Sequence, residues 1–401
     1  MTLITCCQRV TTGTFIASLL LATSVWAQAP RYVDPARDLE NLPTGGGSLG
    51  QAGDDAQIIR FRNWAALSPT RQIRAGDDVL TLPRQEQDFS SLRYTVDGRQ
   101  YSLDDYMVQT HVGGLLVLKD GAIVLERYGL GNTEDSLWVS FSMAKSVTSL
   151  LLGAAIQDGY IISADEKVTD YLPRLKGSSY DQATIRHVLQ MASGVQWNED
   201  YADPRSDVAT YPGGDVVQLF SFLGSKPRVA EPGELFNYNT GETDLVGALV
   251  RAAIGNNLAS YLEHRIWRPF GMEADANWAT HGPGGGERGG CCINATLRDY
   301  GRLGLFVMGG GVLRDGTAVV PPDWIARSIE PSPGSAGYGY LWWLMGDGVF
   351  RASGIYGQGI YINPANDLVI VVLSAWPVAT GSEYSSHRNS FFSAVDAMLD
   401  R

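Results

Sequence analysis

The chain has 401 residues, of which 44% are hydrophobic and 18% are charged, and its formal net charge at pH 7 is −12. This is the composition of a globular protein, and the length suits one large domain or two intertwined ones. The excess of acidic residues disfavours nucleic acids and anionic membrane surfaces as partners.

The first 27 residues predict a secretory signal peptide. Arg9 supplies a positive charge, Phe15–Val25 is apolar, and Val25-Trp26-Ala27 resembles a small-x-Ala cleavage site. We therefore expect a secreted or periplasmic mature protein, with an uncleaved N-terminal anchor as the alternative. No stretch of the chain approaches the ~20 apolar residues that a spanning helix needs, so we expect no membrane span after signal removal.

Residues 28–100 predict an N-terminal arm and lead-in, because the part up to about residue 60 is rich in Pro, Gly and Gln. Folded character becomes clear near Tyr101. The apolar runs Leu115–Leu118 and Ala122–Leu125 then flank Lys119-Asp120-Gly121. Apolar runs around an Asp-Gly turn predict a β-hairpin.

A buried helix is predicted from Ser142 to Asp158, with Gly159 as its C-terminal stop. One side of this helix is an apolar stripe, and the opposite side also carries little charge, which indicates a central, buried position in the fold. Residues 166–290 lack convincing alternating strands, and they contain helical pieces that Pro, Gly and Asp loops separate. We interpret residues 166–290 as a mostly helical insertion. Its clearest helical pieces are 185–192 and 244–253.

The last hundred residues are rich in strand patterns. Thr296 opens a helix with a capping-box-like pattern, and this helix ends at Gly309-Gly310-Gly311. Strands near both ends of the chain, with helices between them, predict an α+β fold with one antiparallel sheet that helices flank. In this interpretation residues 101–165 and 291–401 form an α/β sandwich domain. The predicted late elements are strands at 338–344, 350–353, 361–362 and 368–373, and a helix at 386–399.

The four cysteines fall into two adjacent pairs. Cys6 and Cys7 would leave with the signal peptide, and Cys291 and Cys292 would remain. Neighbouring residues rarely reach disulfide geometry, so we expect two small buried thiols rather than a crosslink. Their role is left open.

Ser142-Met143-Ala144-Lys145 carries the clearest chemical signal in the sequence. A Ser at a helix start and a Lys one turn later share one helical face, as an acylating serine with a lysine base requires. In a buried apolar helix the pKa of Lys145 should fall, and the helix N-terminus favours negative charge that develops near Ser142. A Ser N-cap followed by a solvent-facing Lys is the structural alternative.

Other catalytic arrangements are disfavoured. The one match to the Gly-x-Ser-x-Gly pattern, Gly46–Gly50, lies in the Gly-rich arm and not between a strand and a helix as a nucleophile elbow does, and the chain has no CxxC motif. None of the five histidines lies in a catalytic or metal-binding spacing, so we expect no His-based triad, no metal and no cofactor. The histidines are His111, His187, His264, His281 and His387.

Several motifs accompany Ser142–Lys145 in a specific order along the chain. They are 118–121 (Leu-Lys-Asp-Gly), 189–194 (Leu-Gln-Met-Ala-Ser-Gly), 232–240 (Pro-Gly-Glu-Leu-Phe-Asn-Tyr-Asn-Thr) and 352–358 (Ala-Ser-Gly-Ile-Tyr-Gly-Gln). With these motifs, roughly residues 110–400 resemble the penicillin-recognising serine hydrolases, which include class C β-lactamases, DD-peptidases and related esterases. Within this superfamily, residues 237–243 and 354–358 look most like the branch of 6-aminohexanoate-dimer hydrolases and their esterase relatives.

The resemblance implies a role for each matching position. Ser142 matches the nucleophile, and Lys145 matches the general base that activates it. Tyr238 matches the tyrosine that moves protons to the leaving group and activates water for deacylation. The backbone N–H groups of Ser142 and Ile355 match the oxyanion hole, which needs only main-chain donors. The fold implied is that of the serine β-lactamases.

The resemblance also implies substrate contacts and shows two departures. Tyr201, Gly354 and Tyr356 match positions that would touch the substrate, although an ordinary loop aromatic is an equal reading for Tyr201. Thr240 stands where β-lactamases of this group carry Asn, and residues 352–354 read Ala-Ser-Gly where they carry Lys-Thr-Gly. The missing cation would normally hold a carboxylate, so these departures argue against efficient β-lactamase or DD-peptidase action.

The sequence thus favours an exported serine hydrolase that cleaves a small-molecule ester or linear amide through an acyl-enzyme. One alternative is a β-lactamase or DD-peptidase with a different anchor, such as an Arg. Another is a periplasmic binding or sensor protein that does not turn over. The oligomeric state, the acyl and amine specificity, residual β-lactam activity and the physiological substrate are left open.

Overall fold

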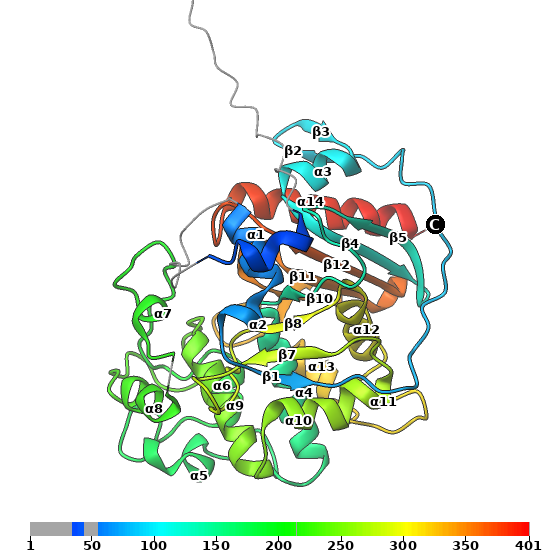
Figure 1. Cartoon of the computed structure of the whole chain (residues 1–401). Coiled ribbons are helices and arrows are strands. Elements are labelled where there is room, and N and C mark those ends of the chain that lie inside the picture. The colour runs from blue at the N-terminus through cyan, green and yellow to red at the C-terminus, as the bar shows by residue number, and fades with distance from the viewer. Residues whose placement is uncertain (1–33, 44–54, 214, 401) are drawn as a thin grey trace, which may run out of the picture.

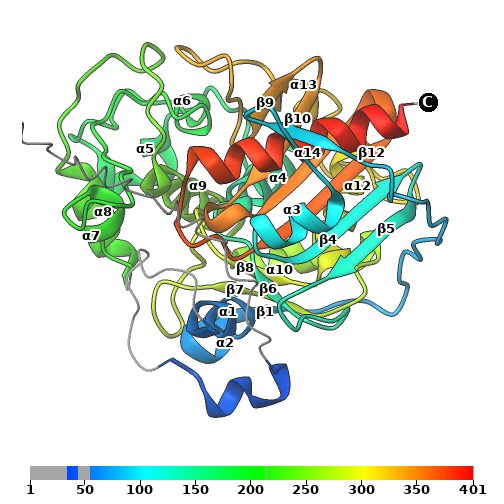
Figure 2. The same ribbon diagram turned by 90° about the horizontal axis from the view of Figure 1, so that it is seen from above.

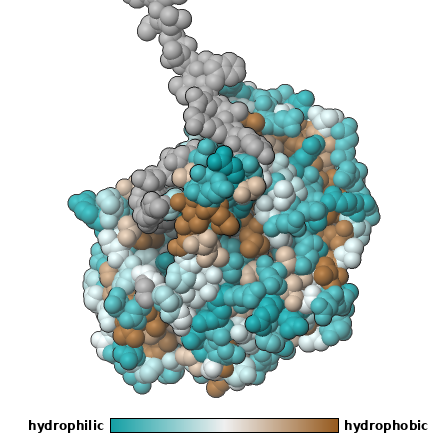
Figure 3. Space-filling view, viewed as in Figure 1, coloured by the Kyte–Doolittle hydropathy of each residue, from teal (hydrophilic) through white to brown (hydrophobic). Residues whose placement is uncertain are grey.

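The computed structural model describes residues 34–43, 55–213 and 215–400 (Figure 1). The predicted signal peptide and Cys6–Cys7 lie outside the described residues. Among the helices of the described part, none is both long and apolar enough to cross a membrane. Figure 3 shows a face of the molecule on which hydrophilic residues predominate, with smaller apolar patches between them.

A six-stranded antiparallel sheet forms the centre of the molecule, and it confirms that strands from both ends of the chain share one sheet. The predicted hairpin provides two neighbouring strands, and the C-terminal strand β12 pairs with the first of them, so that Val371 lies opposite Leu116. The order across the sheet is β5-β4-β12-β11-β10-β9. The bounds are β4 Val112–Lys119, β5 Ala122–Tyr128, β9 Trp343–Gly346, β10 Val349–Ser353, β11 Gly359–Asn363 and β12 Leu368–Ser374.

Helices cover both faces of this sheet, which gives the α+β sandwich expected from the sequence (Figure 2). Because side chains alternate along a strand, Leu115 and Val117 of β4 face one way and Leu116 and Leu118 face the other. The first pair packs in a cluster with α3 (Leu103–Gln109) and α14 (Ser382–Leu399). The second pair belongs to the larger core, which includes residues of α4 (Met143–Gln157) and α12 (Leu297–Met308).

A second sheet and two early helices lie beside the main sheet, so the folded structure begins before Tyr101. The helix α1 (Asp55–Arg62) places Phe61 in the core with an exposed fraction of 3%. The strand β1 pairs with β7, more than 200 residues later in the chain. These contacts are long-range, and no local pattern announces them. The order of the second sheet is β1-β7-β8-β6. Its strands are β1 Thr70–Ile73, β6 Trp138–Val139, β7 Ala276–Ala279 and β8 Ile293–Ala295, and the second early helix is α2 Trp64–Leu67. The strands β2 Tyr94–Val96 and β3 Arg99–Tyr101 form a separate hairpin.

The segment from 166 to 290 is built mainly from short helices and contributes β7 to the second sheet. The division of the chain at 165 and 290 into two domains stays a prediction. Within this segment α9 (Thr240–Ile254) packs against α4, and this contact brings residue 240 beside the start of α4. The other helices are α5 Val168–Tyr171, α6 Ile185–Leu189, α7 Asp207–Thr210, α8 Val216–Gly224, α10 Leu258–Leu262 and α11 Arg268–Phe270.

The structure differs from the sequence expectations in the C-terminal third. The strand expected at 338–344 is regular only from Trp343, because the preceding aromatic residues are buried in irregular backbone, with Leu341 at a positive φ of 63°. The last helix starts at Ser382, four residues earlier than expected. The expectation of two separate thiols is wrong: Cys291 and Cys292 are joined as a disulfide, and the peptide bond between them is cis.

Candidate active site

A fixed turn presents Ser142 at the start of α4. Two hydrogen bonds hold the turn against β8: the N–H of Ser140 donates to the carbonyl of Ile293 over 2.7 Å, and the N–H of Ile293 donates to Oγ of Ser140 over 2.8 Å. Phe141 has a positive φ of 45°, which is a strained conformation for a bulky residue. The turn directs Ser142 into a pocket, where 9% of the residue is exposed.

Lys145 lies one helical turn after Ser142, and its amine makes three hydrogen bonds. Nζ lies 3.0 Å from Oγ of Ser142, 3.0 Å from Oγ1 of Thr240 and 2.9 Å from the carbonyl oxygen of Gly290. The residue is 1% exposed. The alternative of a solvent-facing Lys is therefore excluded.

Burial lowers the pKa of Lys145 to about 8, although the negative charges of Glu199 and Asp244 oppose this shift. Desolvation has this direction because it penalises the charged ammonium. A neutral amine has two hydrogens and one lone pair. Donation to Thr240 and Gly290 uses both hydrogens, so the lone pair remains for the hydroxyl of Ser142. The arrangement can therefore deprotonate this serine.

A close approach of two segments supplies the partners of Lys145. Thr240 is the first residue of α9, and Gly290 lies against it so closely that a Cβ on Gly290 would stand 2.9 Å from the carbonyl oxygen of Thr240. The N–H of Gly290 donates to Oδ1 of Asp244 over 2.8 Å, which fixes the direction of its carbonyl. A residue with a side chain at position 290 would push this acceptor away from Lys145.

Glu199 is a site residue that the sequence interpretation missed. Its carboxylate accepts hydrogen bonds from the N–H of Thr240 over 3.1 Å, from the hydroxyl of Thr240, from Nε1 of Trp197 and from the hydroxyl of Tyr201 over 2.6 Å. The loop that carries Glu199 has no regular secondary structure. The local sequence, Trp-Asn-Glu-Asp-Tyr, does not by itself mark Glu199 as a site residue, because the hydrogen-bond donors to its carboxylate come from two separate segments of the chain.

Tyr238 lies next to both Ser142 and Lys145. Its ring stacks on Trp343, with 5.5 Å between the ring centroids, and Nζ of Lys145 lies 5.3 Å from the centroid of Tyr238. Burial and the charge of Glu199 raise the pKa of Tyr238, and a hydrogen bond with the side chain of Ser142 opposes this shift. The phenol therefore stays protonated at neutral pH and is able to donate a proton near Ser142.

Ser142 and Ile355, whose backbone N–H groups are the expected oxyanion hole, both line the same pocket. Gly354 makes this possible, because a Cβ on Gly354 would stand only 2.4 Å from the carbonyl oxygen of Ser140. The end of β10 thus approaches the turn that carries Ser142 more closely than any other residue type allows. In the described part of the chain neither N–H has an acceptor, so both are free to bind a developing oxyanion.

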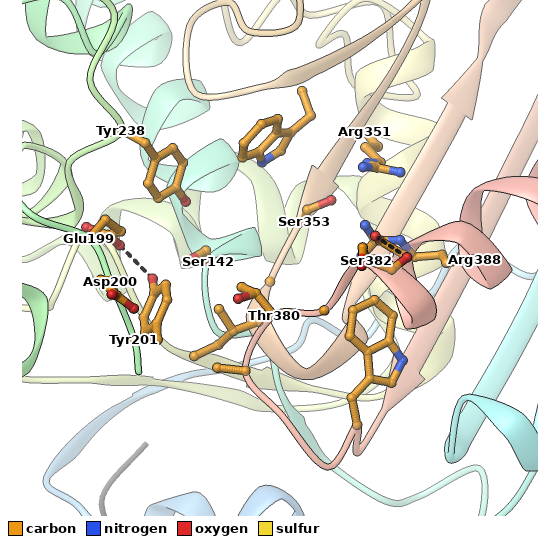
Figure 4. A pocket seen from close by; sticks show the side chains of 17 residues that line it. Ser142, Glu199, Asp200, Tyr201, Tyr238, Arg351, Ser353, Thr380, Ser382 and Arg388 are labelled. Carbon is orange, nitrogen blue, oxygen red and sulfur yellow. Dashed lines mark hydrogen bonds between the residues drawn. The ribbon is translucent and has the colours of Figure 1, made fainter. Parts of the chain in front are cut away.

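The pocket has a volume of about 580 Å³, and its lining residues come from segments that lie far apart in the sequence (Figure 4). The expected substrate contacts Tyr201 and Gly354 lie in this lining. Tyr356 does not, because its ring is buried between Phe61 and Phe141, 5.2 and 5.3 Å from their ring centroids. The chain turns at Tyr356, where φ is 60°, and the structure places this ring in the core rather than in the lining of the pocket.

Two further lining residues, Arg351 and Arg388, were also missed by the sequence interpretation. They lie across the pocket from Glu199 (Figure 4). Nothing in the local sequence marks them, since one is in β10 and the other is in α14. Among the described residues no three His, Cys, Asp or Glu side chains group as a metal site requires.

Comparison with known proteins agrees with this geometry. The family description "Beta-lactamase" matches residues 102–389. The 6-aminohexanoate-dimer hydrolase of Paenarthrobacter ureafaciens is 30% identical over 322 residues, which are 74% of this chain and 81% of that protein. Esterase EstB of Burkholderia gladioli is 29% identical over 150 residues, 35% of this chain and 38% of that protein. A solved structure from Bacillus anthracis, provisionally named a 6-aminohexanoate-dimer hydrolase, has a TM-score of 0.77 at 22% identity and covers 86% of this chain and 95% of its own.

Proposed function

The chain belongs to the beta-lactamase family of serine hydrolases, and within this family we propose that it cleaves a small ester or a linear amide through an acyl-enzyme on Ser142. The three hydrogen bonds of Lys145 carry this proposal, because they leave the lone pair of a neutral amine for the hydroxyl of Ser142. The likeness to the 6-aminohexanoate-dimer hydrolase of Paenarthrobacter ureafaciens supports a linear amide of that kind, and the likeness to esterase EstB supports a short-chain ester.

Acylation begins when Oγ of Ser142 attacks the substrate carbonyl while its proton moves to Nζ of Lys145. The carbonyl oxygen becomes an oxyanion, and the N–H groups of Ser142 and Ile355 stabilise it. Each such donor contributes on the order of 3 kcal/mol to transition-state stabilisation. The phenol of Tyr238 then gives its proton to the leaving oxygen or nitrogen, and the bond to the leaving group breaks.

Deacylation reverses the proton movements with water as the nucleophile. Water gives a proton to the Tyr238–Lys145 pair as it attacks the acyl carbonyl, and the oxyanion forms in the same position. The ester bond to Ser142 then breaks, and Oγ recovers a proton from Lys145. The proton of Ser142 thus returns to Ser142 through Lys145, and the proton that water gives up replaces the one that Tyr238 gave to the leaving group.

We also propose that the protein is exported. The support is the pattern of the first 27 residues, in which a positive residue precedes an apolar run and a small-x-Ala site. N-terminal sequencing of the protein from the expressing cell tests this directly, because export with cleavage yields a chain that starts at Gln28.

The test of the catalytic proposal is a set of initial rates on p-nitrophenyl butyrate, 6-aminohexanoate dimer and nitrocefin, for the purified wild-type protein and for Ser142→Ala. We expect turnover of the ester, the dimer or both, and its loss in Ser142→Ala. Wild-type rates in Ser142→Ala would contradict the proposal. Fast nitrocefin hydrolysis as the dominant activity would favour a β-lactamase, and stoichiometric labelling without turnover would favour a binding protein.

A further inference from the structure

Arg351 and Arg388 bring two cationic side chains to one end of the pocket. Arg351 lies on the face of β10 that it shares with Ser353, while Phe350 and Ala352 point into the core on the other face. Arg388 lies on α14, on the same helical face as Ser382 and Ser385, which also line the pocket. The exposed fractions are 8% for Arg351 and 6% for Arg388.

Neither arginine has an acidic partner among the described residues. Arg351 donates one hydrogen bond, to Oδ1 of Asn389. The guanidinium of Arg388 lies over the ring of Trp376, 5.1 Å from its centroid, and has no hydrogen-bond acceptor in the described part of the chain. Among the described residues, Nε of each arginine is buried without a partner, and so is the hydroxyl of Ser353, which lines the same end of the pocket. Three unpaired polar atoms therefore lie at this end of the pocket.

Other buried arginines of this protein are paired with acids. Arg62 lies 2.8 Å from the carboxylate of Asp38, and Arg302 lies 2.9 Å from that of Asp299. Burial of a guanidinium without a counter-ion is unfavourable, and a second positive charge nearby makes it more so. Burial, and after it the charge of Arg388, lowers the pKa of Arg351. The pair is therefore organised for an anion that none of the described residues supplies.

We propose that Arg351 and Arg388 form an anion subsite that binds a carboxylate carried by the substrate. The proposal rests on the proposed function, since the subsite extends the pocket of Ser142. A guanidinium binds a carboxylate through two parallel hydrogen bonds. Trp376 and Asn389 hold the two guanidinium groups in place before the substrate arrives, which reduces the entropy lost on binding.

The position of the subsite defines the shape of the substrate. Arg351 precedes Ile355, whose N–H belongs to the expected oxyanion hole, by four residues along β10 and the turn that follows it, so the anion lies away from the reacting carbonyl. A carboxylate fused directly to the reacting ring of a compact substrate does not reach this far, whereas the end of a linear chain does. The acidic residues Glu199 and Asp200 lie at the opposite end of the pocket (Figure 4), and they favour binding with the carboxylate at the arginine end.

The test compares charged and neutral substrates in wild type, Arg351→Gln and Arg388→Gln. The p-nitrophenyl monoester of glutaric acid carries its carboxylate on the acyl side, and the butyryl ester of 4-hydroxybenzoate carries it on the leaving side. The neutral references are p-nitrophenyl butyrate and phenyl butyrate. For one of the two charged esters we expect each variant to lose ~10-fold or more in kcat/KM, mainly through KM, with the neutral esters within about twofold of wild type.

Arg327→Gln provides a matched control, because Arg327 also lies over a tryptophan, 5.8 Å from the ring centroid of Trp324, but outside the pocket lining. It should change none of the four rates. Because the Gln variants remove unpaired buried charges, we expect their melting temperatures to equal or exceed that of wild type. If Arg388→Gln does not fold, Arg388→Lys replaces it. Because lysine keeps the charge but not the paired hydrogen bonds, we expect Arg388→Lys to lose less kcat/KM on the charged ester than the ~10-fold expected for the Gln variants.

A binding measurement separates this proposal from the proposed function. N-acetyl-6-aminohexanoate and its neutral analogue N-hexylacetamide are titrated calorimetrically into Ser142→Ala and into Ser142→Ala with Arg388→Gln. Tighter binding of the carboxylate that Arg388→Gln abolishes supports the subsite, even if the wild-type protein hydrolyses nothing. Equal binding of both compounds, together with equal losses on charged and neutral esters, would overturn it.

Discussion

The carboxylate of Glu199 binds both the backbone N–H and the hydroxyl of Thr240. Because the hydroxyl hydrogen of Thr240 points to Glu199, its oxygen is left as an acceptor for Lys145, 3.0 Å away. Lys145 consequently directs its hydrogens to Thr240 and Gly290 and keeps a lone pair toward Ser142. A carboxylate that is not hydrogen-bonded to Ser142 thus determines how the base meets the nucleophile.

The dependence of activity on pH follows from Lys145. The base must be neutral to accept a proton, and burial lowers its pKa to about 8. We therefore expect kcat/KM to rise with pH through a midpoint near 8 and to fall ~10-fold per unit well below it. Lys145→Arg keeps a permanent charge and should lose ~10²–10⁴-fold at every pH. A flat profile between pH 6 and 9 would contradict the role of this amine.

Glu199→Gln should shift the same profile. The negative charge of Glu199 raises the pKa of Lys145, so its removal lowers that pKa and moves the midpoint to lower pH. The amide also binds fewer of the donors that meet at this position, so we expect kcat/KM on the high-pH plateau to fall ~10-fold. Measurement of the full profile separates the two effects. An unchanged midpoint would show that Glu199 and Lys145 are not coupled.

The hydroxyl of Thr240 can be tested against a neighbour one turn along α9. Thr240→Val removes an acceptor of Lys145 and the donor to Glu199, and we expect kcat to fall ~10-fold or more because a buried hydrogen bond of a charged group is lost. Thr243→Val has the same change of shape, but the hydroxyl of Thr243 is buried and has no hydrogen-bond partner in the described part of the chain. Thr243→Val should leave kcat unchanged and the melting temperature equal or higher. Equal effects of the two substitutions on kcat would contradict the role given to Thr240.

Glu242 makes the stability of the protein depend on pH. Burial raises its pKa from 4.5 to about 8, and the hydrogen bonds from Ser193 and Tyr180 oppose the shift. A raised folded-state pKa gives a contribution to stability that is present below pH 4.5 and is lost as the pH rises toward 8. Glu242→Gln cannot ionise, so its melting temperature should match wild type at pH 5 and exceed it at pH 9. A constant difference between the two proteins across this range would show that Glu242 does not titrate in the folded state.

Much of the fold was predictable because its signals are local. The hairpin of β4 and β5 has an Asp-Gly turn, Gly159 with its positive φ follows the end of α4, and strands near both ends of the chain favour one shared sheet, in which β12 pairs with β4. The early helix α1 was not predictable, because its burial depends on contacts with residues far away in the sequence. The irregular run before Trp343 was missed because an aromatic sequence fits a strand and a buried loop equally well.

The same distinction applies to the site. Ser142 and Lys145 share one helical turn, so their spacing alone predicts that they meet, and the structure places the amine 3.0 Å from the hydroxyl. Glu199 contacts Thr240 and Arg388 contacts Trp376, which are in other segments of the chain. A single sequence does not show which segments approach one another. The catalytic roles of Ser142, Lys145 and Tyr238 stay predictions that the geometry supports.

The most direct measurement is to locate the covalent intermediate. The wild-type protein is mixed with p-nitrophenyl butyrate, quenched in acid within one turnover, digested and mapped by mass spectrometry. We predict a butyryl group on the peptide that contains Ser142, absent from Ser142→Ala and from the Lys145→Arg protein. Full turnover with no acyl group on this peptide, or with the acyl group on another residue, would contradict the acyl-enzyme account.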